Sequence, residues 1–191
     1  MMLKERISSF VSRMLLQVIL VFVIIIGSIA SYYLMEKASA LITARTNGMV
    51  TGAEEWFEIQ EGYVRTISTA IEELGLTDTK TPTAEAFLAK CIEENPAVYD
   101  FYVGYEDGTS AFGSEWDVTP EEYDPRTRDW YKSALQTDGV SLSEAYVDAK
   151  SGKMVITFSR AIRAEGKVTG VFAADFYLDE LVALADSLGS S

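Results

Sequence analysis

Residues Tyr123–Tyr131 read YDPRTRDWY and bring arginine, tryptophan and tyrosine side chains together within one short stretch. Arg128 carries a planar guanidinium whose parallel N–H donors match the two oxygens of a carboxylate. Trp130 and Tyr131 each combine a large apolar ring with one polar atom. The stretch therefore has the side chains that hold a small organic anion.

Two further polar residues, Tyr146 and Asp175, follow near the ends of strand-like segments. Asp175 lies in the apolar run GVFAADF, and a carboxylate among small buried residues needs a compensating partner. That partner is either Arg160 or Arg163 on the preceding strand, or the ammonium group of a ligand. An arginine and an aspartate at opposite ends of one pocket would suit a free amino acid.

Each of these residues also has an interpretation that involves no ligand. Arg128 would form a surface ion pair with Asp124 or Asp129, and the aromatic residues would belong to the hydrophobic core. Taken singly, each of these residues fits the interpretation without a ligand more often than the functional one.

The spacing Tyr-x4-Arg-x-Trp-Tyr, followed later by Tyr and Asp, resembles the amino-acid-binding motif of double Cache sensor domains. These are the extracytoplasmic PAS-like domains of bacterial chemoreceptors and sensor kinases. The resemblance extends over residues 36–191, and all six motif positions are filled. The matching residues are Tyr123, Arg128, Trp130, Tyr131, Tyr146 and Asp175. The family normally has two stacked modules, a return helix and a cytoplasmic output domain. Only the first module is found here, so we expect a fragment of a longer receptor or a truncated one.

The resemblance implies a role for each motif residue. Arg128 and Trp130 would hold the ligand carboxylate, through the guanidinium and the indole N–H. Asp175 would accept the ligand ammonium, assisted by tyrosine hydroxyl groups. The tyrosines concerned are Tyr123, Tyr131 and Tyr146.

The composition excludes several classes of function. The 191 residues carry a net charge of −13, of which residues 1–35 contribute +2 and the remainder −15. Such an acidic surface disfavours nucleic acid and anionic membrane surfaces as partners. The chain has no histidine and one cysteine, Cys91, which excludes an internal disulfide, a His/Cys zinc site and a His-dependent nucleophile. A Ca²⁺ site at Asp148 lacks an adequate ligand set. We therefore expect neither an enzyme nor a bound metal or cofactor.

Residues 14–35 contain no charged side chain and predict a transmembrane helix. A helix of this length spans ~33 Å, enough to cross the hydrocarbon core of a bilayer. The basic tail, residues 1–13, predicts a cytoplasmic N-terminus and an extracytoplasmic position for everything after Met35. A cleaved signal peptide is the alternative, because Ser28 and Ala30 are small residues at the spacing of a cleavage site. The uncharged run continues past that site, which favours the retained anchor.

Residues 36–76 predict one long stalk helix, with apolar residues at helical spacing and a stop at Gly75. A kink is expected near Gly48, Gly52 or Gly62. We expect this helix to pair two copies of the chain in a homodimer. A second helix is expected from Thr83, as part of a weak capping box, to about Glu94, before Asn95-Pro96.

The remaining pattern predicts an antiparallel sheet of five strands, interrupted by a helical segment over residues 128–136. A final helix would cover residues 178–188 and be capped by Gly189. The expected strands are residues 98–105, 110–113, 141–147, 154–163 and 168–176. The prediction is an α+β chain in which residues 77–191 form a membrane-distal, PAS-like Cache module with flanking helices.

The expected function is the extracytoplasmic sensing of a free amino acid by a membrane-embedded bacterial receptor. Two alternatives remain. Sensors of amines use a similar aromatic and aspartate set without the carboxylate-binding arginine, so Arg128 argues against this class. The other alternative is a membrane-anchored dimerisation module that binds no ligand.

Overall fold

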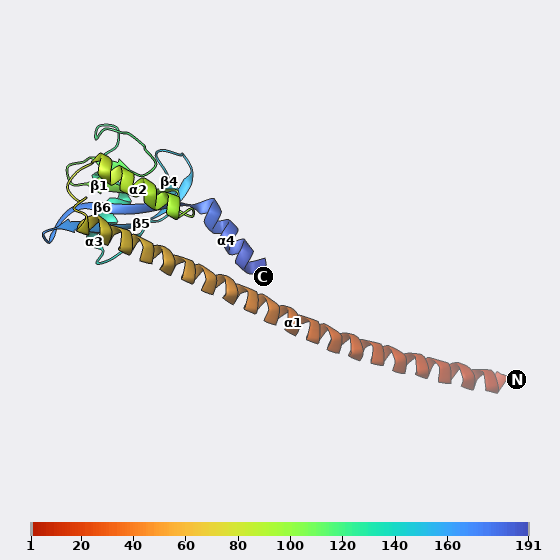
Figure 1. Cartoon of the computed structure of the whole chain (residues 1–191). Helices are drawn as coiled ribbons and strands as arrows, with labels where there is room; N and C mark the ends of the chain where they lie inside the picture. Colours follow the sequence, from red (N-terminus) through yellow and green to blue (C-terminus); the bar gives the residue numbers. More distant parts are fainter. Residues whose placement is uncertain (1, 191) are drawn as a thin grey trace. The chain divides into compact units, whose positions relative to one another are not determined.

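A computed structural model describes the backbone of residues 2–190 and the side chains of residue 10 and residues 13–187. The chain divides into two compact units, Met1–Gly48 and Met49–Ser191. The helix α1, Met2–Glu73, contributes to both units and continues through Gly48, Gly52 and Gly62 (Figure 1). Most side chains of the predicted tail, residues 1–13, lie outside the described part.

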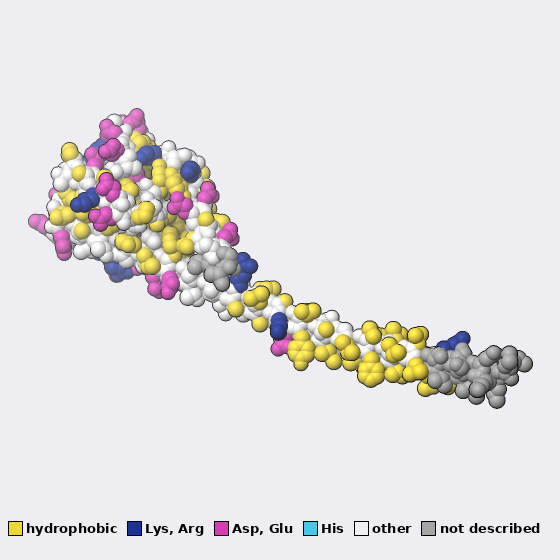
Figure 2. Space-filling model, turned by 45° about the vertical axis from the view of Figure 1, so that its right-hand side comes forward, with side chains coloured by type: hydrophobic (Ala, Val, Ile, Leu, Met, Phe, Trp, Pro, Cys, Tyr) yellow, Lys and Arg dark blue, Asp and Glu magenta, His cyan; other side chains and the backbone are white. Residues whose placement is uncertain are grey.

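The first unit consists of the N-terminal part of α1, whose apolar side chains are exposed. Figure 2 shows hydrophobic side chains covering this part of the helix. Among the described residues, one helix is long and apolar enough to cross a membrane, and the qualifying stretch begins at Arg13. A signal sequence near an N-terminus has the same composition, so both predicted interpretations of residues 14–35 remain compatible with it.

The end of α1 confirms the predicted stop at Gly75. Gly75 has a φ of +67°, which suits glycine, and its N–H donates to the Glu72 carbonyl at 3.2 Å. The Leu76 N–H donates to the Ile71 carbonyl at 3.0 Å. These two bonds define a Schellman motif, in which Leu76 packs in the same core cluster as Ile71.

The second helix, α2, covers Pro82–Glu94 and ends at Asn95 as predicted. Its N-cap is Thr81, not part of a capping box starting at Thr83. The Thr81 hydroxyl accepts from the Ala84 N–H at 3.1 Å. Pro82 occupies the first helical position, where a missing N–H costs nothing.

The predicted α+β fold is confirmed, with an antiparallel sheet whose main path is β2-β1-β6-β5-β3, and β4 pairs with β5. The strands are β1 Asp100–Tyr105, β2 Ser110–Phe112, β3 Ser141–Leu142, β4 Tyr146–Val147, β5 Met154–Ala164 and β6 Lys167–Tyr177. The sheet has six strands instead of five because the predicted strand 141–147 is interrupted. The Ser143 hydroxyl accepts from the Thr157 N–H at 3.0 Å, so a side chain takes the place of a ladder carbonyl.

The two faces of the sheet pack against different elements. One face, which includes Phe101 and Phe172, contacts α2 and residues of α1 such as Val64. The other face, which includes Tyr102 and Ala173, is covered by a short 3-10 helix and by α3. The 3-10 helix is Pro125–Thr127 and α3 is Asp129–Gln136. Arg128 is therefore the extended N-cap of α3 and not its first helical residue.

The last helix, α4, runs over Leu178–Ser190 and follows β6 directly. Gly189 lies inside this helix, so the predicted cap at Gly189 is wrong. A glycine inside the last turn of a helix and a glycine that ends a helix look the same in a sequence pattern. The pattern therefore identified the stop at Gly75 but misplaced the end of α4.

Candidate functional site

Asp175 lies on the α3 side of the sheet and is 3% exposed. Its carboxylate accepts hydrogen bonds from the Tyr102 hydroxyl at 2.8 Å and from the Thr157 hydroxyl at 2.6 Å. Within the described residues, no arginine or lysine forms an ion pair with it. Burial raises the pKa of Asp175 to about 7, although the bonds from Thr157 and Tyr102 act in the opposite direction. The carboxylate is thus hydrogen-bonded but has no counter-charge.

The ion pair with a neighbouring-strand arginine is not formed. The Arg160 guanidinium donates to the Ser68 hydroxyl of α1 at 2.7 Å, on the opposite face of the sheet from Asp175. Arg163 is exposed, and its backbone N–H donates to Glu72. Neither arginine therefore serves as the structural partner that the sequence allowed.

Arg128 is also without an acidic partner in the described part of the chain. Its Nε is buried and makes no hydrogen bond there, and its guanidinium lies 4.5 Å from the centre of the Tyr123 ring. The two acidic neighbours in the sequence interact with other cations. Asp124 pairs with Arg126 at 2.9 Å, and Asp129 lies 3.9 Å from Lys132. The guanidinium of Arg128 is therefore available to an anion.

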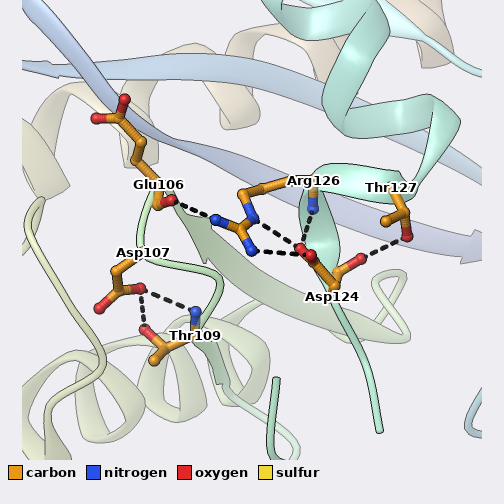
Figure 3. Close-up of polar contacts among 6 residues, drawn as sticks. All are labelled: Glu106, Asp107, Thr109, Asp124, Arg126 and Thr127. Atoms are coloured by element: carbon orange, nitrogen blue, oxygen red, sulfur yellow. Dashed lines mark hydrogen bonds and ion pairs between the residues drawn. The ribbon is translucent and has the colours of Figure 1, made fainter. Parts of the chain in front are cut away.

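The segment that carries Arg128 is fixed to the β1–β2 hairpin by Arg126 (Figure 3). Arg126 donates to both oxygens of Asp124 and, at 3.1 Å, to the backbone carbonyl of Glu106. Gly104 of β1 provides the space beneath this segment. A Cβ atom there would lie 2.5 Å from the Pro125 Cβ and 3.0 Å from the Trp130 ring. The absence of a side chain at Gly104 thus allows the 3-10 helix and Trp130 to approach the sheet.

Trp130 and Tyr131 are both buried but point to different surroundings. Trp130 packs edge-on against Tyr102, with ring centres 5.1 Å apart, and its carbonyl accepts from the Ser159 hydroxyl at 3.0 Å. The pKa of Tyr131 is raised by burial and by the charge of Glu106, which lies on the hairpin side. Tyr131 nevertheless belongs to the same buried aromatic cluster as Tyr123 and Trp130, and its ring centre lies 5.6 Å from that of Trp130.

A cavity of about 580 Å³ opens between the start of α3 and residues 142–146. Of the six predicted site residues, its wall includes Arg128, Trp130 and Tyr146. Tyr123 lies against the Arg128 guanidinium, and Asp175 lies behind Tyr146. The structure thus brings Arg128, Trp130 and Tyr146 to the cavity and places Tyr123 and Asp175 directly behind its wall. Tyr131 packs in the same aromatic cluster as Tyr123 and Trp130 but does not line the cavity.

Tyr146 connects the cavity to the buried carboxylate. Its hydroxyl lies 2.8 Å from the Thr157 hydroxyl and 3.5 Å from the Asp175 carboxylate. Thr157 uses its only hydroxyl hydrogen on Asp175, so Tyr146 must be the donor to Thr157. The result is a relay of hydroxyl groups that runs from the cavity wall to Asp175.

Four residues of this region were missed by the sequence patterns. Tyr102 and Thr157 hold Asp175 directly, and Asp100 and Asp148 are buried carboxylates whose charges raise its pKa. Asp100 and Thr157 are both register partners of Asp175, on β1 and β5. A correct antiparallel alignment of the three strands would have identified Asp100 and Thr157 as neighbours of Asp175. Within the described residues, no group of three or more acidic, His or Cys side chains could hold a metal ion.

The fold and the cavity define a PAS-like ligand-sensing module. Residues 77–183 match the family model of the methyl-accepting chemotaxis protein-like first PDC sensor domain. The chain belongs to this family, which agrees with the resemblance inferred from the six-residue motif.

Curated relatives are receptors of the same kind. The methyl-accepting chemotaxis protein PctB of Pseudomonas aeruginosa is 31% identical over 121 residues, which cover 62% of this chain and 19% of that protein. McpG of Pseudomonas putida is 37% identical over 87 residues, covering 46% of this chain and 13% of that protein. The chain thus matches less than a fifth of the length of these receptors.

Solved sensor domains share the architecture. The ligand-binding domain of the Pseudomonas aeruginosa amino acid chemoreceptor PctC, in complex with GABA, is 30% identical with a TM-score of 0.64. The match covers 74% of this chain and 64% of that one. The sensory domain of the Campylobacter jejuni chemoreceptor Tlp3, with isoleucine bound, has a TM-score of 0.65 at 24% identity. It covers 77% of this chain and 63% of that domain, and it shows the common fold.

Proposed function

We propose that this chain is the ligand-sensing part of a transmembrane chemoreceptor and that it binds a free amino acid through both charged groups. One observation carries the proposal. Arg128 lines the cavity and Asp175 lies directly behind its wall at Tyr146, and among the described residues neither side chain has an ion-pair partner. Opposite charges at two ends of a site complement a zwitterion. The similar PctC domain was solved with GABA, which also carries a carboxylate and an amine.

The carboxylate end of the ligand would bind at Arg128, whose fork of donors can engage both oxygens. Trp130 is the second donor at this end. Its indole lies close enough to the Tyr123 hydroxyl to lower the pKa of that hydroxyl, against the larger rise that burial causes. The indole N–H would donate to the ligand carboxylate.

The ammonium end would bind at Asp175, with Asp148 as a second carboxylate. Tyr146 stands between the cavity and Asp175, so the ammonium reaches Asp175 when residues 142–146 move aside. This segment is held to β5 by two short strands, β3 and β4, and by the bonds of Ser143 and Tyr146 to Thr157. Short strands open at a lower free-energy cost than central ones, which makes the segment a suitable entrance.

A comparison of GABA with butylamine tests the proposal, because butylamine is GABA without its carboxylate. Thermal unfolding of the full chain in detergent would be measured with each proteinogenic L-amino acid, with GABA and with butylamine. A true ligand at ~100 times its Kd stabilises the fold by about 2.7 kcal/mol. Stabilisation by GABA or an L-amino acid, but not by butylamine, supports the proposal. Stabilisation by butylamine to the same extent indicates an amine sensor, and no stabilisation by any compound indicates a dimerisation module.

The membrane arrangement is part of the proposal. Residues 14–35 span the membrane, the N-terminus is cytoplasmic, and the sensor module lies outside. In a Cys91→Ser background, a cysteine introduced at the exposed Glu121 should react with a membrane-impermeant thiol reagent in intact cells. Labelling only after lysis would refute this orientation.

We also propose that the stalk part of α1 pairs two copies of the chain. Ile59 and Tyr63 lie one turn apart on α1 and expose 55% and 46% of their surfaces. In the same Cys91→Ser background, a cysteine introduced at Tyr63 should form a disulfide between two chains under mild oxidation. A cysteine at Glu61, on another side of the helix, is the control.

A further inference from the structure

The buried carboxylate of Asp100 has a role that the ligand contacts do not explain. Asp100 begins β1, is 3% exposed and does not line the cavity. Its oxygens accept from the Ser114 N–H at 3.1 Å and, in a short contact, from the Ser114 hydroxyl. Burial raises the pKa of Asp100 to about 6, and the bonds from Ser114 and the charge of Lys150 limit the rise.

Ser114 is in turn held by a cation from a distant turn. The Lys150 ammonium donates to the Ser114 hydroxyl oxygen at 2.5 Å and to the Ser114 carbonyl at 3.1 Å. The donors and acceptors are consistent, since the serine hydroxyl donates its hydrogen to Asp100 and accepts from Lys150. Asp100, Ser114 and Lys150 therefore form one continuous chain of polar contacts, which we call the clasp.

The clasp joins the two loops that flank the candidate site. Ser114 is the second residue of the segment 113–122, which leads into Tyr123 beneath Arg128. Lys150 lies in the turn 148–153, which starts at Asp148 and closes on itself through a 2.8 Å bond from the Asp148 N–H to the Lys153 carbonyl. At the sheet, Asp100 is the register partner of Asp175. One end of the clasp is thus paired with Asp175 across the sheet, and the other end lies in the turn that carries Asp148.

We propose that Asp100, Ser114 and Lys150 are positioning residues that tie the turn 148–153, which carries Asp148, and the segment 113–122 to the start of β1, next to Asp175. The ligand role rests on the proposed function. Lys150 balances the charge of Asp100, so that Asp148 and Asp175 are left for a ligand ammonium. Because the outer half of the clasp consists of polar contacts to an exposed lysine, it can open without disrupting the core.

Hydrogen exchange of the full chain in detergent, without ligand, tests the clasp. Lys150→Met removes the ammonium and keeps the length of the side chain. It should accelerate exchange in residues 113–122, which lie across the clasp. Ser114→Ala should accelerate exchange in residues 148–153, and both variants should leave β5 unchanged. Lys150→Arg should restore most of the protection, because it keeps a charged donor.

Lys153→Met is the matched control, since its ammonium lies in the same turn but over the Tyr177 ring, 4.4 Å from its centre. This variant should leave residues 113–122 protected. The proposal would be overturned if Lys150→Met left the exchange rate of residues 113–122 unchanged. It would also be overturned if Lys153→Met accelerated their exchange equally. This readout needs no ligand, so it decides the clasp even if the proposed function fails.

Binding then tests the ligand role. For GABA or the L-amino acid that stabilises the wild-type chain most, Lys150→Met should weaken affinity about tenfold, which corresponds to ~1.4 kcal/mol. Lys150→Arg should bind within about threefold of wild type on the same scale. Wild-type affinity in Lys150→Met, together with faster exchange, would show that the clasp does not position the site and would refute that role.

Discussion

Thr157 and Asp175 are register partners on β5 and β6, and the Thr157 hydroxyl donates to the Asp175 carboxylate at 2.6 Å. This pair places a charge-assisted hydrogen bond in the interior of the sheet, where a carboxylate is costly to bury. The bond orients the carboxylate and leaves its charge without a described counter-ion. A buried carboxylate of this kind can bind a cationic ligand group, whereas it lowers the stability of the protein without ligand.

Asp175→Asn should therefore keep or raise the stability of the unliganded chain while it abolishes amino-acid binding. The pKa of Asp175 is raised from 3.8 to about 7, so the folded state binds the proton more tightly than the unfolded state. The stability that the proton on Asp175 contributes to the fold is therefore fully present below about pH 4 and is lost as the pH rises through about 7. Melting temperatures of Asp175→Asn and of the wild-type chain should therefore differ more at about pH 8 than at about pH 5, with the variant the more stable.

Asp138→Asn, at an exposed position, is the control for this experiment. A buried ion pair would give the opposite result, since breaking it costs ~3–5 kcal/mol. A large drop in the melting temperature of Asp175→Asn would mean that the carboxylate has a structural partner.

Amino-acid affinity should rise with pH between about pH 6 and about pH 8. The ligand ammonium binds the ionised form of Asp175, so binding below the raised pKa must displace a proton. Calorimetry in two buffers of different ionisation enthalpy should detect this proton release. A pH-independent affinity together with no proton release would contradict the assignment of Asp175 to the ammonium end.

Arg128→Ala should lower affinity by ~30-fold or more, because truncating one partner of a buried charge pair costs at least ~2 kcal/mol. Its melting temperature without ligand should change little, since among the described residues the guanidinium contacts the Tyr123 ring and has no acidic partner. Arg128→Lys should not restore binding, because an ammonium lacks the planar fork. Arg126→Ala is the contrasting variant and should lower the melting temperature, since Arg126 anchors the segment at Asp124 and Glu106.

Tyr146→Phe and Tyr131→Phe should differ, although both positions belong to the six-residue motif. Tyr146 lines the cavity and its hydroxyl begins the relay to Asp175, so its loss should weaken binding about tenfold, or ~1.4 kcal/mol. Tyr131 lies outside the cavity wall, so its hydroxyl should have little effect on affinity. Titrations of both variants with the same amino acid check this; equal losses would place Tyr131 in the site.

The sequence by itself determined the class of fold and most residues of the candidate site. The apolar run of residues 14–35, the stop at Gly75 and the period-two segments are local signals, because burial of one face imposes a regular spacing on the chain. Arg128, Trp130, Tyr146 and Asp175 were recognisable as a set because their spacing resembles the motif of double Cache sensor domains.

Only the tertiary structure decided which polar groups meet. Tyr102, Thr157 and Asp100 reach the region of Asp175 through the registers of β1, β5 and β6, and a shift of one residue would turn each of them to the other face. The Asp100–Ser114–Lys150 clasp joins loops that are distant in the sequence. The interruption of strand 141–147 depends on a hydroxyl that competes with the backbone for one N–H. These features depend on contacts between segments, which no local spacing encodes.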